Sequence, residues 1–282
     1  MEKLTPHTAP GLERRLFMRG AACATACVAG GALNLLAAPA SAAVWRGMVG
    51  CIKPTAGGSS LADMIRLLPN GIGVAAVYLD LVERSREEFQ TSYPTYEKHI
   101  AYLAAQHCDL ISIEGAPPFM ILGPDGEAKL VDGWKQKYKA DMFTSAQNQV
   151  NVLKAMKLKK ILGVTPFGTD LNQSYTKYFE ANGIGVAAME DMRAALGGNP
   201  DPSNERMYSI IKKKFLAQTG APDSIYILGS GWDTLGIITP LEQDLGVPVV
   251  QPVAARVWEI QKRLHVRQPV QGFGVLLETL PA

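Results

Sequence analysis

The most constraining feature of this chain is an internal duplication. The heptapeptide Asn-Gly-Ile-Gly-Val-Ala-Ala occurs at residues 70–76 and again at residues 182–188. At the same or nearly the same shift, the apolar run ending at Pro54 aligns with the run ending at Pro166, and residues 109–115 align with residues 223–229. Chance repetition of Gly, Ala and Val can produce one such match but not an ordered set. The sequence therefore predicts two homologous lobes.

Each half of the chain contains short apolar runs bounded by Gly, Pro or Asp and separated by longer stretches of helical period. Such runs are typical of buried parallel strands that helices join through right-handed crossovers. The sequence therefore predicts an α/β protein of two pseudo-symmetric lobes, each a doubly wound parallel sheet flanked by helices, with a ligand cleft between them. The predicted strands are residues 47–52, 72–79, 110–113, 160–164, 184–189, 225–228 and 247–250.

The duplication also sets the expected division of the chain into domains. We expect residues 43–144 to form lobe one, completed by residues 256–282, and residues 145–255 to form lobe two. The segment 117–141, rich in Pro, Gly, Asp and Lys, is either a lid over the cleft or a surface excursion. Helical periodicity predicts helices over residues 93–106, 145–156, 172–182, 204–218 and 233–245.

The first part of the chain, residues 1–42, is expected to be a signal peptide. The pair Arg14-Arg15, the nearby Phe17, the weakly hydrophobic run 20–43 and the small-residue site ending at Ala42 resemble a twin-arginine signal. The resemblance implies that the twin-arginine translocation machinery exports the folded chain, so that it is periplasmic or secreted. A membrane anchor is the alternative, because the uncharged run is long enough to span a bilayer. Its Gly, Pro and Ser content favours cleavage and no stable membrane anchor.

Removal of this leader leaves a chain without excess charge. The whole sequence has 28 Lys and Arg against 26 Asp and Glu, and the leader carries the entire difference. A balanced chain lacks the positive field that a nucleic-acid partner requires, so no nucleic acid is expected. The apolar content of 47% is too high for a disordered chain. Only Cys51 and Cys108 remain, which excludes a disulfide framework and predicts two buried thiols.

The positions that directly follow the predicted strands are the candidates for a ligand site. In doubly wound sheets, ligands bind beyond the carboxyl ends of the strands. The turn 229–231 also leads into a predicted helix, where free backbone N–H groups favour a carboxylate or a phosphate. The residues at these positions are Lys53, Pro54, Thr55, Glu114, Gly115, Ala116, Thr165, Pro166, Phe167, Gly229, Ser230 and Gly231.

Several segments of the chain resemble the aspartate/glutamate racemase superfamily, and within it the arylmalonate decarboxylase and maleate isomerase branch. They lie at residues 47–57, 109–115, 162–172, 227–235 and 240–250, and the resemblance spans residues 46–260. It implies the same two-lobed fold and cofactor-free chemistry on small carboxylates. In that family a Cys at the end of one strand in each lobe moves a proton to or from the substrate. The decarboxylase branch keeps only the second Cys.

The chain departs from this pattern at the positions that carry the chemistry. Gly115 and Gly229 occupy the two Cys positions, Ala116 replaces a hydroxyl donor and Phe167 replaces a donor Tyr. The proton carrier of the family is therefore missing from its usual positions. The resemblance still implies a carboxylate site lined by Pro54, Thr55, Gly115, Ala116, Thr165, Phe167, Gly229 and Gly231.

Two residues are candidate catalytic groups in place of the missing cysteines. Ser230 can donate a hydrogen bond to a carboxylate, or it can cap the helix expected to begin near Asp233. Glu114 can act as a carboxylate base in a sheltered cleft, although strand alternation places it on the opposite side of the strand from Gly115. Lys53 either pairs with an anionic substrate or is solvated.

No motif in the sequence indicates a metal or a cofactor. His99, His107 and His265 are scattered without the spacing of metal ligands, and the Gly- and Ser-rich segment 55–60 lacks the Lys of a phosphate-binding loop. The expected function is that of a cofactor-independent lyase or isomerase, of the arylmalonate decarboxylase or maleate isomerase type, acting on a small carboxylate. The alternative is a non-catalytic periplasmic protein that binds or senses carboxylates on the same fold.

Overall fold

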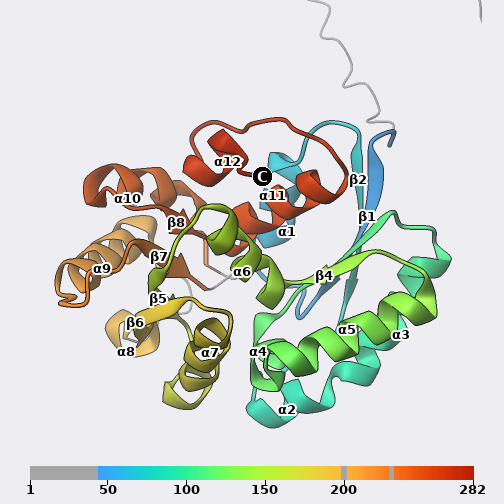
Figure 1. Cartoon of the computed structure of the whole chain (residues 1–282), viewed down its shortest axis with the longest axis horizontal. Helices are drawn as coiled ribbons and strands as arrows, with labels where there is room; N and C mark the ends of the chain where they lie inside the picture. Colours follow the sequence, from blue (N-terminus) through green and yellow to red (C-terminus); the bar gives the residue numbers. More distant parts are fainter. Residues whose placement is uncertain (1–43, 198–201, 229–231) are drawn as a thin grey trace, which may run out of the picture. The chain divides into compact units, whose positions relative to one another are not determined.

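Two parallel β-sheets form the centre of the structure, one in each lobe (Figure 1). The computed structural model describes residues 44–197, 202–228 and 232–282. The strand orders are β2-β1-β3-β4 and β6-β5-β7-β8, and all neighbours are parallel, so the predicted two-lobed α/β fold is confirmed. The strands are β1 (Gly47–Lys53), β2 (Ile72–Tyr78), β3 (Leu110–Ile113), β4 (Met142–Thr144), β5 (Lys160–Thr165), β6 (Gly185–Asp191), β7 (Ser224–Ile227) and β8 (Val249–Val250).

Helices connect successive strands and cover the sheets (Figure 1). In lobe one, for example, α3 packs against β1 and β3, and in lobe two α7 packs against β6. The helices are α1 (Ser60–Leu67), α2 (Arg86–Thr91), α3 (Tyr93–Ala105), α4 (Ala116–Leu122), α5 (Pro124–Tyr138), α6 (Ser145–Ala155), α7 (Thr169–Ala181), α8 (Met192–Leu196), α9 (Asn204–Leu216), the 3₁₀ helix η1 (Leu235–Ile237), α10 (Ile238–Leu245), α11 (Pro252–Arg263) and α12 (Val275–Thr279).

The two copies of the repeated heptapeptide occupy equivalent places in the two sheets. Each copy forms an edge strand, β2 in the first sheet and β6 in the second, next to the first strand of its lobe. The first glycine of each copy, Gly71 or Gly183, has a φ of 91° or 81°. Glycine adopts this left-handed conformation without the steric cost of a side chain, so the repeated Asn-Gly pair makes the same turn before the strand in both lobes.

The segment 117–141, expected as a lid or a surface excursion, forms two helices instead. It contains most of α4 and the whole of α5, and α5 buries Val131 and Trp134. These two side chains lie three residues apart and therefore on one face of the helix, which packs into the core. The strand β4, which the sequence did not predict, follows directly and has only three residues.

The helix expected from Asp233 begins later than predicted. A short 3₁₀ helix, η1, comes first, and the α-helix α10 starts at Ile238. The α10 helix ends at Leu245, where the sequence placed its end, because Gly246 adopts a φ of 68° that suits a helix C-terminus.

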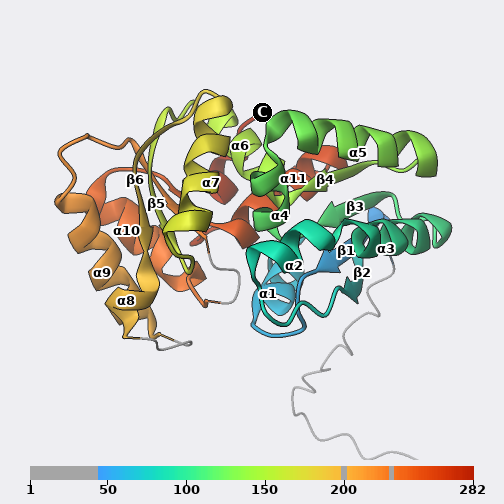
Figure 2. The same cartoon turned by 90° about the horizontal axis from the view of Figure 1, so that it is seen from below.

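Two helices lie between the sheets and connect the lobes (Figure 2). The helix α6 contacts α11, and α11 also contacts α1 and β3 of the first lobe. A second connection is made by α4, which contacts α7. Each strand belongs to one of the two sheets. The exact boundaries between the lobes, near residues 144 and 256, remain predictions.

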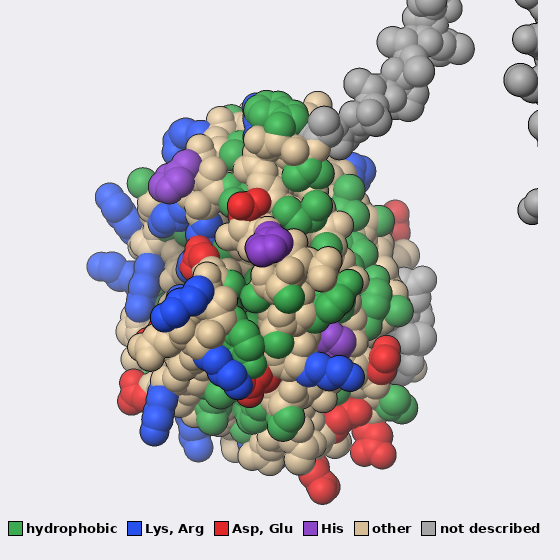
Figure 3. Space-filling model, turned by 90° about the vertical axis from the view of Figure 1, so that its right-hand side faces the viewer, with side chains coloured by type: hydrophobic (Ala, Val, Ile, Leu, Met, Phe, Trp, Pro, Cys, Tyr) green, Lys and Arg blue, Asp and Glu red, His purple; other side chains and the backbone are tan. Residues whose placement is uncertain are grey.

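The described surface carries charges of both signs. Figure 3 shows one face, on which Lys and Arg side chains and Asp and Glu side chains occur among hydrophobic ones. Within the described ranges no helix has the length and apolar character to cross a membrane. The expected signal peptide, residues 1–42, lies outside the described residues.

Candidate functional site

A cavity of about 300 Å³ lies at the carboxyl ends of the strands of both sheets. Its walls include residues that follow β1, β3, β5 and β7, together with residues of α6 and α11. The lining residues are Lys53, Pro54, Thr55, Gly57, Gly58, Ser60, Leu81, Arg84, Phe89, Tyr96, Gly115, Ala116, Pro117, Pro118, Ser145, Gln149, Pro166, Phe167, Leu228, Trp232, Pro252 and Arg256. The two lobes thus contribute to a single cavity.

The structure brings most of the described candidate residues together around this cavity. Five predicted substrate-binding residues line it: Pro54, Thr55, Gly115, Ala116 and Phe167. Two described candidates, Thr165 and Glu114, are absent from the lining. The remaining candidates, Gly229, Ser230 and Gly231, lie outside the described residues.

Thr165 supports the wall of the cavity from behind. Its side chain is fully buried, and its hydroxyl lies 2.6 Å from Oδ1 of Asn172. The same hydroxyl oxygen accepts a hydrogen bond of 3.0 Å from the backbone N–H of Phe167. Thr165 therefore fixes the turn that carries Phe167 into the cavity.

Gly115 has no room for a side chain. Its φ is +94°, and a Cβ atom added there would lie 2.5 Å from the hydroxyl oxygen of Tyr96 and 3.0 Å from Pro54. The Tyr96 hydroxyl is held in place because it donates a hydrogen bond of 2.8 Å to the backbone carbonyl of Glu114. The local backbone and the packing of Tyr96 therefore favour glycine at position 115.

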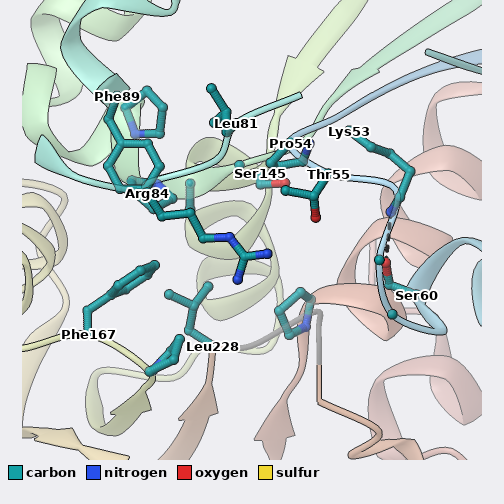
Figure 4. Close-up of a pocket in the computed structure, with 18 of the residues that line it drawn as sticks. Lys53, Pro54, Thr55, Ser60, Leu81, Arg84, Phe89, Ser145, Phe167 and Leu228 are labelled. Carbon is teal, nitrogen blue, oxygen red and sulfur yellow. Dashed lines mark hydrogen bonds between the residues drawn. The ribbon is translucent and has the colours of Figure 1, made fainter. Parts of the chain in front are cut away.

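A buried cluster of charges lies against one wall of the cavity. Nζ of Lys53 and Nη2 of Arg256 lie 3.0 and 3.1 Å from the same oxygen, Oε2 of Glu114. The Lys53 amine also donates a hydrogen bond of 2.7 Å to Ser60 (Figure 4). Each of the four residues of this cluster, Lys53, Ser60, Glu114 and Arg256, is at most 3% exposed. The sequence left open a solvated Lys53, and this alternative is wrong. Two cations share one carboxylate, which leaves one formal positive charge.

The opposite wall of the cavity is largely apolar. Phe89 and Phe167 meet edge to face with ring centroids 6.2 Å apart, and Leu81 and Leu228 lie beside them. From the loop between β2 and α2, the guanidinium of Arg84 extends between these side chains and Thr55 (Figure 4). The cavity therefore offers an apolar wall and a cationic wall to one ligand.

Three cavity residues, on α6, α11 and the β2–α2 loop, were not predicted from the sequence. Gln149, Arg256 and Arg84 follow none of the predicted strands directly, so position alone did not identify them. One signal was present for Arg256: it is a lone charge between Ala255 and Val257 in an apolar stretch. A charged residue in such a stretch is almost never fully buried unless it is paired.

Neither described cysteine takes part in the site. Both are free and buried, as predicted, and neither lines the cavity. Burial, together with the nearby Glu114 carboxylate, raises the pKa of Cys51 to about 12. Burial also raises the pKa of Cys108. Neither thiol is therefore prepared to form the thiolate that nucleophilic or acid–base chemistry requires.

The described residues contain no group of three or more His, Cys, Asp or Glu side chains placed to hold a metal ion. The charges that line the cavity are cationic instead. The chemistry of this lining suits an anion.

Comparison with solved structures shows the same fold. A maleate isomerase from Pseudomonas putida has a TM-score of 0.71 at 18% identity, over 83% of this chain and 99% of that chain. A liganded double mutant of arylmalonate decarboxylase has a TM-score of 0.73 at 20% identity, over 82% and 99%. A maleate cis-trans isomerase from Nocardia farcinica bound to TRIS has a TM-score of 0.72 at 17% identity, over 82% and 98%.

A family model assigns the chain to a protein family, whereas solved structures of such low identity show only the fold. The comparison with curated proteins finds no match. The model that describes arylmalonate decarboxylase matches residues 49–277, which include every described residue of the cavity wall and both sheets except the first two residues of β1. The chain therefore belongs to the arylmalonate decarboxylase family.

Proposed function

We propose that this protein is a cofactor-independent lyase or isomerase that acts on a small carboxylate. The observation that carries the proposal is the charge of the cavity. Three cationic side chains line it, Lys53, Arg84 and Arg256, and no acidic side chain belongs to the described part of its lining. Two of the cations are buried and share one carboxylate, so an anionic ligand would balance the charge of the cluster.

The shape and polarity of the cavity favour a small ligand with an apolar part. A volume of about 300 Å³ lies at the lower end of the range of small-molecule sites. The aromatic wall made by Phe89 and Phe167 would contact the apolar part, while the cationic wall would hold the carboxylate. In the related structures, a maleate isomerase variant is described with maleate, which supports the same ligand class here.

We infer that Lys53 is the proton carrier among the described lining residues. Arginine keeps its proton at any pH a protein survives, which excludes Arg84 and Arg256 as carriers. Burial raises the pKa of Tyr96, and its hydroxyl proton is engaged with the backbone of Glu114. Glu114, the carboxylate base expected from the sequence, holds the two cations and is absent from the lining. The ammonium of Lys53 has three N–H donors and uses two of them on Glu114 and Ser60, so this lining side chain keeps one proton for a ligand.

The proposed place of action is the periplasm or the cell exterior. It rests on the twin-arginine pattern around Arg14-Arg15. Fractionation of cells that express the full chain, with and without the substitution of both arginines by lysine, would test it. Retention of the unchanged chain in the cytoplasm would contradict it.

The second candidate function is carboxylate binding without turnover. One observation favours it: the site has no room for a Cys at Gly115, and both thiols are buried away from the cavity. A relative, the maleate cis-trans isomerase of Nocardia farcinica, is described with a covalently bound succinylcysteine intermediate. Because neither Cys51 nor Cys108 lines the cavity, neither thiol can form such a covalent intermediate with a ligand bound there.

Turnover separates the two functions. The chain without residues 1–42 would be incubated in deuterated buffer with malonates, maleate and amino acids, and followed by NMR. Deuterium incorporation, isomerisation or release of carbon dioxide supports the enzyme. Binding detected by calorimetry without any of these changes supports the binding protein. If none of the compounds binds or reacts, both functions are excluded for this ligand class.

A further inference from the structure

Two residues that line the cavity each have a buried side-chain nitrogen atom without a hydrogen-bond partner. These atoms are Nη1 of Arg256 and Nε2 of Gln149. Both residues line the cavity and are at most 2% exposed. Buried donors in folded proteins nearly always have an acceptor, so these two point to an acceptor that a ligand provides.

The other end of each side chain is already fixed. Nη2 of Arg256 lies 3.1 Å from Oε2 of Glu114, which orients the guanidinium. The side-chain oxygen of Gln149 accepts a hydrogen bond of 2.6 Å from the hydroxyl of Tyr226, which leaves the amide nitrogen as the free donor. The two donors are therefore held in place before any ligand arrives, which reduces the entropy lost on binding.

The two residues come from neighbouring helices. Gln149 belongs to α6 and Arg256 to α11, and these helices contact one another. Their donors differ in charge, since one is a guanidinium and the other a neutral amide. A carboxylate can accept from both, because each of its oxygens has more than one acceptor site.

We propose that a ligand carboxylate binds at the α6–α11 wall, between Arg256 and Gln149. The proposal rests on the proposed function, because it assumes that the ligand is a small carboxylate. It differs from the site that the sequence suggested, the backbone turn at residues 229–231. It also differs from the hydroxyl donors that the family resemblance implies, whose positions hold Ala116 and Phe167 here.

Calorimetric titration with malonate and with maleate at low ionic strength tests this subsite. The variants are Arg256→Gln and Gln149→Glu. The first removes the charge and leaves Lys53 paired with Glu114. The second keeps an oxygen that can accept from Tyr226 and places a negative charge beside the expected carboxylate.

Matched control variants lie on the same helices. Lys262→Gln removes an exposed cation of α11, and Gln147→Glu makes the same change as Gln149→Glu at a residue of α6 that does not line the cavity. We expect the affinity of the wild-type chain and of both controls to agree within about threefold, and the affinity of Arg256→Gln and Gln149→Glu to fall at least about tenfold.

The outcomes distinguish the subsite from the proposed function. If the wild-type chain binds a carboxylate and both Arg256→Gln and Gln149→Glu bind it equally well, the subsite is overturned while the proposed function stands. If the wild-type chain binds neither malonate nor maleate and turns over no carboxylate, the proposed function fails, and the subsite fails with it. If circular dichroism shows that Arg256→Gln does not fold, the carboxylate affinity of Gln149→Glu is compared with that of Gln147→Glu. Equal affinities of these two variants overturn the subsite.

Discussion

The amine of Lys53, at the end of β1, lies 3.0 Å from the carboxylate of Glu114, which follows β3, and both side chains are almost completely buried. The strands β1 and β3 are neighbours in the first sheet, so the pair joins two adjacent strand ends at the cavity. Glu114 also meets Arg256 from α11. This carboxylate therefore holds together the sheet of lobe one and the helix that carries the proposed carboxylate donor.

Removal of the Glu114 charge should destabilise the fold. Glu114→Gln leaves two buried cations without their counter-charge, and we expect the free energy of unfolding to fall by about 3–5 kcal/mol. The added substitution Lys53→Met should recover part of this loss, because it removes one unpaired cation. As a control, Asp170→Asn breaks the exposed pair with Arg86 and should cost less than about 1 kcal/mol. Urea unfolding compares the three variants with the wild-type chain. Equal losses of stability for Glu114→Gln and Asp170→Asn would contradict the role of Glu114 as the counter-charge of two buried cations.

Replacement of Lys53 by arginine should separate binding from catalysis. Lys53→Arg keeps a positive charge that can pair with Glu114, but arginine does not release its proton. For a substrate found by the NMR assay, we expect the catalytic rate constant to fall at least about a hundredfold while the affinity changes little. Full turnover by a folded Lys53→Arg chain would exclude Lys53 as the proton carrier.

The thiols should be dispensable. The double variant Cys51→Ala, Cys108→Ala should keep wild-type turnover or ligand binding, because neither thiol lines the cavity. Iodoacetamide should not inhibit the native chain, since burial raises the pKa of both thiols. We expect a loss of stability of about 1 kcal/mol per site from the smaller core side chains. Loss of turnover in a double variant that stays folded would identify a catalytic thiol.

A side chain at position 115 should be costly, whereas one at position 133 should not. Gly115→Ala places a Cβ atom against the Tyr96 hydroxyl at a φ of +94°, and we expect a loss of at least about 1–2 kcal/mol. Gly133 lies within α5, and a Cβ atom there would meet nothing within 4 Å. Gly133→Ala should therefore stabilise the fold by about 0.5–1 kcal/mol. Thermal unfolding compares the two, and equal effects would contradict the role of Tyr96.

A buried glutamate at the junction of the lobes should make stability depend on pH. Glu127 of α5 accepts hydrogen bonds from Thr144 and from Tyr178 of α7. Burial raises the pKa of its carboxyl above the ordinary value, so the folded chain binds this proton more tightly than the unfolded chain does. The contribution of Glu127 to stability therefore falls as the pH rises from its unfolded pKa through its raised folded pKa.

The variant Glu127→Gln isolates this effect. The amide cannot ionise, so the variant should gain stability relative to the wild-type chain as the pH rises from 4 to 8, in urea unfolding measured at each pH. A difference that stays constant over this range would show that the carboxyl has the same pKa in both states.

Much of the fold could be predicted because its signals are local. The repeated heptapeptide and the short apolar runs depend only on neighbouring residues, and they gave both sheets except β4. The rule that ligands bind beyond strand ends then led to Pro54, Gly115 and Phe167, which do line the cavity. A strand of three residues such as β4 contains too few alternations to produce a period, so it was missed.

The chemistry of the cavity was decided by the tertiary structure. Arg256 and Lys53 meet at the same carboxylate oxygen although about two hundred residues separate them. The sequence gives no distance between α11 and the end of β1, so it left open whether Lys53 is paired or solvated. The pairing of β1 with β3 brings Lys53 to Glu114, and the packing of α11 and α6 between the sheets brings Arg256 to the same carboxylate. This packing also leaves Nη1 of Arg256 and Nε2 of Gln149 without a partner. The sequence determines the strands through local periodicity, whereas long-range packing determines which side chains meet and therefore which charge the cavity presents.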